Sequence, residues 1–442
     1  MRIKGLLVAA LVLAALSGAL YWSNRKQKAE ESKPAAETPK IVKMEANDVQ
    51  KVELKRKDGQ VVVVERGRDN QWTITAPKPL RADQETTGSL VSTLASLSSD
   101  KVVDEKPADL SQFGFNTPSL EVTITKKDGK TAKILVGDDA PTGGGAFVKT
   151  TDDPKVYTVA SYNKSSFDKT ANDLRDKRLM TFENDKLTRV EVSSKGRSVE
   201  FGKNAKGDWA ILKPKPMRAD GIQVDELIRR LRDAKMDASV SDEDAKKAAA
   251  AFSGGTLIAT AKVADNAGTQ QLEVRKSKED YYARSSVVEG AYKVTSELGS
   301  GLDKKVDDFR NKKVFDFGFN DVTKLEIHDG AKAVQFEKSG EKWKSGAQEM
   351  DSVGVQSLID KLREASATKF LDSGFPAATF DATLTYGNSA EKVLFAKSGD
   401  KTLARRDNEP TVYELEGKTL DELQKAVSDV KPAQPPKEAK KK

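Results

Sequence analysis

Tryptophan, arginine and aspartate recur along this chain at nearly constant spacing, and all three side chains can bind ligands. Trp72, Trp209 and Trp343 lie at intervals of 137 and 134 residues. The first two are followed by Arg81–Ala82–Asp83 and Arg218–Ala219–Asp220. A tryptophan ring can serve as a stacking platform for a ligand, and an arginine beside a carboxylate can form a site for an anion or a carboxylate.

The same residues have structural explanations, which we favour. A tryptophan at the end of a hairpin usually packs over a sheet or a helix, so we predict that the three tryptophans lie in the core. An arginine in the loop before a helix is commonly solvated or ion-paired. An aspartate directly before a helix can accept hydrogen bonds from the free N–H groups of the first turn. Three helix N-caps are therefore predicted at equivalent positions: Asp83, Asp220 and Asp351.

Two basic clusters and a glycine run are weaker candidates. Leu174–Leu179 reads LRDKRL and Phe309–Val314 reads FRNKKV, and such clusters could bind phosphate or acidic lipid headgroups. A cluster of this kind after an amphipathic helix is usually a solvated last turn, favoured by the helix dipole, and we predict that arrangement. Gly143–Gly145 lacks the Lys–Ser/Thr pair of a phosphate-binding loop, so we expect a turn between strands.

Composition excludes several kinds of site. The chain has no cysteine, which rules out disulfides, thiolate zinc sites, iron–sulfur clusters, cysteine nucleophiles and the lipid-bearing cysteine of a bacterial lipoprotein. Most acid–base mechanisms use histidine, and the sole histidine, His328, is expected to be a surface residue. Aspartate pairs at 138–139, 152–153 and 307–308 lack calcium-loop spacing. We predict no catalytic, cofactor-binding or metal-binding residues.

The elements that position these residues form a unit that occurs three times. Each copy begins with two alternating stretches joined by a glycine-containing turn, starting at Asp48, Lys186 and Asp321. This pattern predicts an antiparallel hairpin. Each tryptophan is then followed by apolar residues at i, i+3, i+4 and i+7, which predict a helix with one apolar stripe. The stripes are Leu90, Val91, Leu94 and Leu97; Val224, Leu227, Ile228 and Leu231; and Val355, Leu358, Ile359 and Leu362.

The second half of each copy returns to strands and ends in a helix. Four alternating stretches follow the first helix, and the last of them carries a tyrosine in register: Tyr157, Tyr292 or Tyr413. Closing helices are predicted at residues 163–174, 298–309 and 419–428. The order predicts an α+β fold: an N-terminal transmembrane helix, then three similar modules, each an antiparallel sheet with one or two helices packed on it.

The N-terminal segment predicts a membrane anchor. Residues 5–22 form a run of 18 residues without charge, flanked by Lys4 and Arg25, and this is the lower end of a bilayer span. We predict an uncleaved signal anchor in the inner membrane, with residues 1–4 in the cytoplasm and the bulk of the chain in the periplasm or extracytoplasmic space. A cleaved signal peptide is the alternative.

Domain boundaries follow from the repeat. We expect a flexible linker at 23–40, α+β repeats at 41–181 (module 1), 182–316 (module 2) and 317–430 (module 3), and a disordered basic tail at 431–442. Of the net charge of +7, residues 1–28 carry +5 and the tail +4, which leaves −2 for the rest. A nucleic-acid groove needs a concentrated basic surface, so no nucleic-acid partner is expected.

The chain resembles the DUF4340 domain proteins. The resemblance rests on the N-terminal span, the hairpin with its tryptophan, GFNTPSLEVTI at Gly114–Ile124 and LRDKRLMTF at Leu174–Phe182, and it covers nearly all of residues 42–430. Module 3 lacks the LRDKR motif, and its GFPAATF segment at Gly374–Phe380 matches imperfectly. The resemblance implies a bacterial, membrane-anchored protein, often an accessory component of ABC-type transport systems of the gliding-motility kind. It supplies no catalytic residues.

We therefore expect a non-enzymatic interaction or scaffold protein of the bacterial envelope, held by its N-terminal helix and contacting another envelope or transporter protein. No cofactor is expected, and no motif names a small-molecule ligand. One alternative is a carbohydrate- or peptidoglycan-binding envelope protein, which requires exposed aromatic side chains. A less favoured alternative is an envelope hydrolase, which requires two carboxylates about 5–10 Å apart in a cleft.

Overall fold

The computed structural model describes residues 39–141, 144–237 and 242–434. The predicted anchor at 5–22, most of the predicted linker and most of the basic tail lie outside these ranges, and no helix within them is long and apolar enough to cross a membrane. The chain divides into two compact units. One ends at Lys177 and takes in Asp237–Asp244, and the other comprises Arg178–Met236 and Ala245–Lys442. The second unit therefore holds module 3 and nearly all of module 2.

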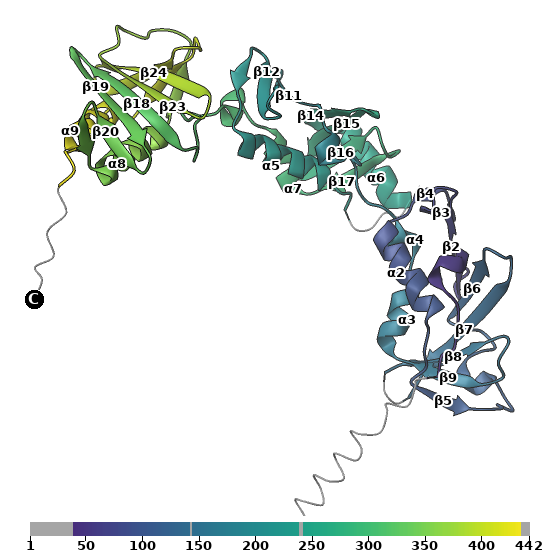
Figure 1. The fold of residues 1–442 in the computed structure, drawn as a ribbon. Coiled ribbons are helices and arrows are strands. Elements are labelled where there is room, and N and C mark those ends of the chain that lie inside the picture. Colours follow the sequence, from purple (N-terminus) through teal and green to yellow (C-terminus); the bar gives the residue numbers. More distant parts are fainter. Residues whose placement is uncertain (1–38, 142–143, 238–241, 435–442) are drawn as a thin grey trace, which may run out of the picture. The chain divides into compact units, whose positions relative to one another are not determined.

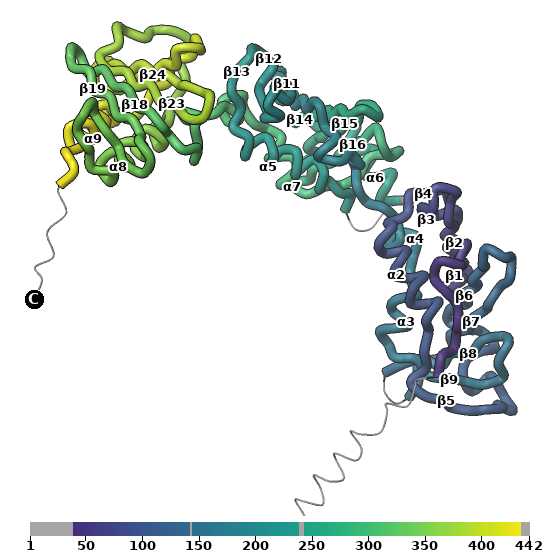
Figure 2. The backbone as a smooth tube through the Cα atoms, in the orientation of Figure 1, coloured from purple at the N-terminus to yellow at the C-terminus, as the bar shows by residue number. Residues whose placement is uncertain are grey.

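Three antiparallel sheets, one in each module, confirm the predicted α+β class (Figure 1). Figure 2 follows the backbone through each sheet in turn. In every module the first strand lies inside the sheet, between its hairpin partner and a strand from the second half of the module. The predicted hairpins are confirmed, because these two strands pair antiparallel in all three modules.

Module 1 has a nine-stranded sheet in the order β4-β3-β2-β1-β6-β7-β8-β9-β5. Its strands are β1 (Val49–Arg56), β2 (Val61–Arg66), β3 (Trp72–Ala76), β4 (Leu80–Arg81), β5 (Lys101–Asp104), β6 (Leu120–Lys126), β7 (Thr131–Asp139), β8 (Ala146–Thr150) and β9 (Val156–Val159). Its helices are η1 (Ala46–Asp48), α2 (Gln84–Ala95), η2 (Ser111–Phe113), α3 (Ser161–Phe167) and α4 (Ala171–Leu174).

Module 2 has an eight-stranded sheet in the order β13-β12-β11-β10-β14-β15-β16-β17. Its strands are β10 (Arg189–Ser194), β11 (Arg197–Lys203), β12 (Trp209–Lys213), β13 (Met217–Arg218), β14 (Thr256–Asp265), β15 (Gly268–Ser277), β16 (Asp280–Ser285) and β17 (Ala291–Val294). Its helices are η3 (Asn184–Lys186), α5 (Gly221–Arg232), α6 (Asp242–Gly254), α7 (Ser296–Leu302) and η4 (Val306–Phe309).

Module 3 has a nine-stranded sheet in the order β21-β20-β19-β18-β23-β24-β25-β26-β22. Its strands are β18 (Val322–Asp329), β19 (Lys332–Ser339), β20 (Lys342–Ser345), β21 (Gln348–Met350), β22 (Lys369–Leu371), β23 (Phe380–Tyr386), β24 (Ser389–Ser398), β25 (Lys401–Arg406) and β26 (Val412–Leu415). Its helices are α8 (Ser352–Glu364) and α9 (Thr419–Asp429).

The helices cover one face of the sheet, as module 3 shows. Helices α8 and α9 share a single core cluster with alternate residues of β18 and β23, and alternate residues of a strand point to the same face. Complete burial of a leucine or phenylalanine contributes about 1.5–3 kcal/mol. The predicted apolar stripes are confirmed, because every residue of the three stripes is buried.

The three predicted N-caps are also confirmed. Asp83 accepts a hydrogen bond of 2.8 Å from the N–H of Thr86. Asp220 and Asp351 each accept from the N–H groups two and three residues farther along the chain. The aspartates therefore cap α2, α5 and α8, and they fix the point at which each helix starts after its preceding strand.

Two of the three predicted closing helices are wrong, because each segment forms two short helices in place of one. The third is confirmed as α9. Residues 163–174 form α3 and α4, because Thr170 and Asp173 make a capping box that starts a new helix. Residues 298–309 form α7 and η4, because Asp303 leaves the helical conformation at φ −86°, ψ 63°. Strands β5 and β22 and helix α6, which lie between the first helix and the later strands, were not predicted. The short strands between each hairpin and the first helix, β3–β4, β12–β13 and β20–β21, were not predicted either.

Candidate functional site

Arg218 occupies the centre of a polar cluster in the second compact unit. It ends β13, the outermost strand of the module 2 sheet, where it pairs with Ala210 of β12. Its carbonyl accepts a hydrogen bond of 3.0 Å from the N–H of Asn311, and two residues later Asp220 caps α5. The strand pairing, the hydrogen bond from Asn311 and the cap of α5 therefore fix the backbone around Arg218. Only 18% of the Arg218 side chain is exposed.

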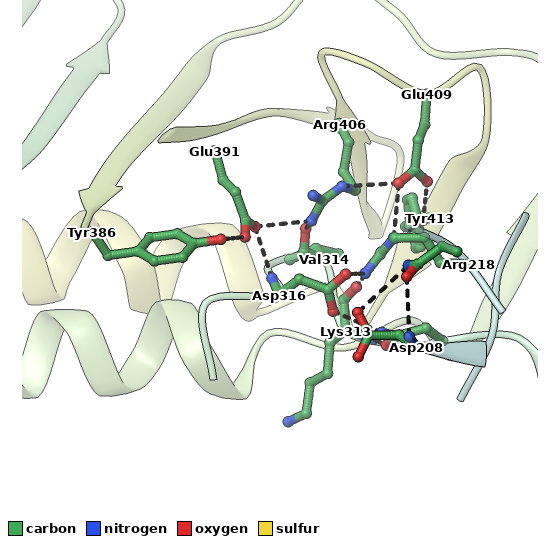
Figure 3. Close-up of polar contacts among 12 residues, drawn as sticks. Asp208, Arg218, Lys313, Val314, Asp316, Tyr386, Glu391, Arg406, Glu409 and Tyr413 are labelled. Atoms are coloured by element: carbon green, nitrogen blue, oxygen red, sulfur yellow. Dashed lines mark hydrogen bonds and ion pairs between the residues drawn. The ribbon is translucent and has the colours of Figure 1, made fainter. Parts of the chain in front are cut away.

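The partners of Arg218 come from module 3 and from the chain that leads into it (Figure 3). Nη2 donates to the carbonyl of Lys313 at 2.5 Å and to the hydroxyl of Tyr413 at 2.9 Å. Nη1 lies 2.7 Å from Asp316 Oδ2, and Nε lies 2.7 Å from Glu409 Oε1. These last two contacts are ion pairs without the angles of hydrogen bonds. One guanidinium therefore contacts two residues at the end of module 2, Lys313 and Asp316, and two residues of module 3, Glu409 and Tyr413.

The charge of Arg218 is well supported by these neighbours. Burial by itself would lower the pKa of Arg218, but Tyr413, Asp316 and Glu409 raise the pKa above its usual value. A guanidinium also has a rigid fork of donors that matches carboxylate geometry. The side chain therefore acts as a permanently charged connector.

Arg406 forms a second centre next to the first. It ends β25, and only 7% of its side chain is exposed. Nη1 lies 3.0 Å from Glu391 Oε2 and donates to the carbonyl of Val314 at 2.7 Å. Nε lies 3.0 Å from the same Glu409 oxygen that faces Arg218. Glu409 therefore links the two guanidinium groups.

Glu391 ties this second centre to the end of module 2. It is buried, and it accepts hydrogen bonds from the N–H of Asp316 at 2.7 Å and from the hydroxyl of Tyr386. We call the resulting network the module 2–3 junction; its side chains are Arg218, Asp316, Tyr386, Glu391, Arg406, Glu409 and Tyr413.

The basic clusters lie deeper than expected. The prediction of a solvated last turn is wrong for Arg175, Asp176 and Arg310, which are at most 8% exposed. Arg310 Cζ lies 3.7 Å from the ring centroid of Phe370, and its Nη2 donates to Thr411 at 3.2 Å. Stacking on an aromatic ring and a fixed donor pattern favour burial of arginine. Arg310 thus adds further contacts between the end of module 2 and module 3.

The three tyrosines that were predicted in register each donate a hydrogen bond to a residue upstream in the chain. Tyr157 donates to Asp153 and Tyr413 donates to Glu409, both at 2.6 Å and both four residues upstream. Tyr292 donates instead to the backbone carbonyl of Glu289. In module 3 the acid held in this way is the one that contacts both junction arginines.

The tryptophans differ from one another. Trp72 and Trp343 are buried at 5% exposure, as predicted, whereas Trp209 is only partly buried. In module 1, Gln84 clasps the tryptophan backbone, accepting from the N–H of Trp72 at 2.7 Å and donating to its carbonyl at 2.9 Å. The equivalent residue after the N-cap of module 2 is Gly221, which has no side chain for this contact.

A cleft of about 1260 Å³ adjoins the junction. Its wall includes Trp209 and Gly221 of module 2 and Glu391, Arg406 and Glu409 of module 3. The two glutamates converge, as a hydrolase of the expected kind would need, but each lies 3.0 Å from Arg406, which stands between them. Both carboxylates are therefore ion-paired with the same arginine.

The other candidates from the sequence do not assemble into a site. His328 is a surface residue in β18 with 53% of its side chain exposed, and its Nδ1 lies 2.9 Å from Asp381. Across the described ranges, no three acidic or histidine side chains are grouped so as to hold a metal ion. Asp139, from one of the aspartate pairs, is ion-paired to Lys164 at 2.6 Å.

Tyr413 gives the junction a measurable dependence on alkaline pH. Burial raises the pKa of Tyr413 to about 12, although the charge of Arg218 opposes the shift. Since an unfolded tyrosine has a pKa of about 10, the contribution of this group to stability is complete below pH ~10 and is lost as pH rises through about 12. We expect the urea midpoint of the intact chain to fall more steeply between these pH values than that of Tyr413→Phe.

The matched control for this titration is Tyr162→Phe, because Tyr162 is 69% exposed. Its midpoint should follow the wild-type curve at every pH. Superimposable curves for the wild type and Tyr413→Phe would contradict the assignment of a buried, neutral phenol at the junction.

The comparisons with known proteins identify a family. The family described as a domain of unknown function (DUF4340) matches residues 72–251 and 209–384. The two matches begin at Trp72 and Trp209, so they follow the structural repeat. No curated protein and no solved structure matches the chain. Together the family matches cover residues 72–384, and the chain belongs to the DUF4340 family.

Proposed function

We propose that this protein is a non-enzymatic scaffold of the bacterial envelope, anchored in the inner membrane by residues 5–22, whose modules contact a partner protein in the extracytoplasmic space. The partner we propose is a component of an ABC-type transport system or of another envelope assembly. The proposal rests on the structural roles of the recurring polar residues. In modules 2 and 3 they cap helices, anchor tyrosines and join one module to the next.

The junction supports a scaffold because it restrains one module against the other. Interfaces between domains of one chain are usually modest, and relative motion is the default unless the interface is large. Here Arg218 and Arg310 reach into module 3, and Lys215 lies 2.5 Å from Asp372. A restrained pair of modules presents its surfaces in a defined relative order, which is what an extended docking surface needs.

Partner capture in cells tests the proposal. The full-length protein is treated with an amine-reactive crosslinker in intact cells, solubilised in detergent and analysed by mass spectrometry. Reproducible crosslinks from lysines of the modules to one membrane or exported protein are expected. Crosslinks confined to the chain itself would contradict the scaffold. Arg218→Ala should redistribute these crosslinks, whereas Arg229→Ala, which removes an exposed helical ion pair with Glu226, should not.

Topology can be tested separately, because the chain has no native cysteine. A single cysteine at Ala331, in the exposed turn between β18 and β19, should react with a membrane-impermeant maleimide in cells whose outer membrane has been permeabilised. A single cysteine at Ile3 should react only after lysis. The reverse pattern would contradict the proposed orientation.

A carbohydrate- or peptidoglycan-binding role is the second candidate. Burial of Trp72 and Trp343 removes two of its three candidate aromatics. The partly exposed Trp209 in the wall of the cleft favours it.

A further inference from the structure

Trp209 is placed as a binding residue would be, although its equivalents in modules 1 and 3 are core residues. It begins β12 as Trp72 begins β3, so the backbone positions correspond. The difference lies in the residue after the N-cap, which is Gln84 in module 1 and Gly221 in module 2. A Cβ added at Gly221 would meet no atom within 4 Å. The cleft wall beside Trp209 thus has no side chain at this position, where module 1 has a glutamine bonded to the tryptophan backbone.

The polar groups of the cleft come from both modules. Among its lining residues are six carboxylates and four basic side chains. The acids are Asp185, Asp208, Asp225, Asp316, Glu391 and Glu409, and the bases are Lys203, Lys206, Arg218 and Arg406. Acids outnumber bases, so the cleft repels a polyanion, and nucleic acid and phosphate chains do not fit it.

An extended peptide is also a poor fit, for a different reason. Peptides commonly bind by adding a strand to an open sheet edge. The outer edge of β13 is already used, since the carbonyl of Arg218 accepts from Asn311, Ala219 forms a bridge with Arg310, and the N–H of Asp220 donates to Phe309. No backbone edge is left on this side of the described sheet for strand addition.

We infer that the cleft binds a neutral oligosaccharide, with one sugar ring stacked on Trp209. A pyranose ring has an apolar C–H face that packs on an indole, and its hydroxyls accept from guanidinium groups and donate to carboxylates. The cleft is larger than the roughly 300–1,000 Å³ typical of a single small-molecule pocket, which suits a ligand of several rings. Lys203 lies 5.4 Å from the Trp209 ring centroid. An exposed lysine is readily displaced from a ring by a ligand.

Titration of the full-length, detergent-solubilised protein with cellohexaose and with chitohexaose tests the inference. Calorimetry should detect binding of at least one of these neutral hexasaccharides, and tryptophan fluorescence should change with the same dissociation constant. Trp209→Ala should weaken the binding at least tenfold. Trp343→Phe alters a buried tryptophan of module 3 and should leave the dissociation constant unchanged.

Gly221→Gln keeps the inference falsifiable if Trp209→Ala impairs folding. Glutamine is the residue that module 1 has at this position. Its side chain should occupy part of the cleft beside Trp209 and weaken binding at least tenfold while the urea midpoint is kept. Absence of binding by both hexasaccharides, or binding that both variants leave unchanged, would overturn the inference. The oligosaccharide site is independent of the proposed scaffold role, because Gly221→Gln should leave the crosslinked partner unchanged.

Discussion

Replacement of Arg218 by alanine is expected to release module 3 from module 2. Arg218 makes two hydrogen bonds, to the Lys313 carbonyl and the Tyr413 hydroxyl, and two ion pairs, with Asp316 and Glu409. Truncating one partner of a buried charge pair costs about 2–5 kcal/mol, and we expect a loss in this range from the four contacts together. The loss leaves Asp316 and Glu409 without the Arg218 guanidinium, and Glu409 keeps only its pair with Arg406. We expect the cost to fall on the contact between the modules, because the side chain is outside the core cluster of module 3.

Hydrogen exchange of the intact protein measures this release. Peptides spanning Lys312–Asn320 and β26 should exchange faster in Arg218→Ala, whereas peptides from the module 1 sheet should not change. Arg218→Lys should give an intermediate result, since lysine keeps the charge but offers a point donor in place of a fork. Arg229→Ala is the control. Exchange rates in Arg218→Ala equal to those in the control would show that the junction is not held by this residue.

Local patterns were sufficient to predict much of the architecture. The apolar stripes gave the positions of α2, α5 and α8 because a period of 3.6 residues is visible within a single helix. The aspartates at 83, 220 and 351 were recognisable as N-caps because a cap acts on N–H groups two or three residues away. The hairpins were recognisable because a strand, a turn and its partner are contiguous.

The junction could not be predicted in the same way. Arg218 meets Tyr413, which is 195 residues away in the sequence, and no periodicity relates two such positions. The sequence did contain one indication, an acid four residues before the tyrosine in modules 1 and 3, Asp153 and Glu409. A recurrent spacing between two polar residues in a strand and its preceding turn is a reason to expect a buried polar pair.

The divergence among the repeats is as informative as their similarity. Equivalent positions after the N-caps hold Gln84, Gly221 and Ser352, and only the first clasps the tryptophan backbone. Trp343 is buried without this clasp, whereas Trp209, beside Gly221, is only partly buried. A repeated fold keeps its helices and strands through such changes because the apolar stripes are untouched, so each copy is free to change its surface.

Glu391→Ala is expected to destabilise module 3 strongly. It removes the carboxylate that faces the buried Arg406 guanidinium and accepts from the N–H of Asp316 and the hydroxyl of Tyr386. Removing one partner of a buried ion pair costs about 3–5 kcal/mol, because the remaining charge is left without compensation. Glu391→Ala should therefore lower the urea midpoint of the intact protein and speed up the hydrogen exchange of β24 and β25.

A double-mutant cycle separates the ion pair from the loss of packing. If the uncompensated charge is the main cost, Glu391→Met combined with Arg406→Met should be less destabilising than Glu391→Met alone, since both charges are then absent. Glu349→Ala, which breaks an exposed pair with Lys342 in the same module, should change stability by no more than about 1 kcal/mol. Additive effects of the two methionine changes would show that Glu391 and Arg406 do not act as a pair. Glu409 would then be the only acid that stabilises Arg406 in the junction.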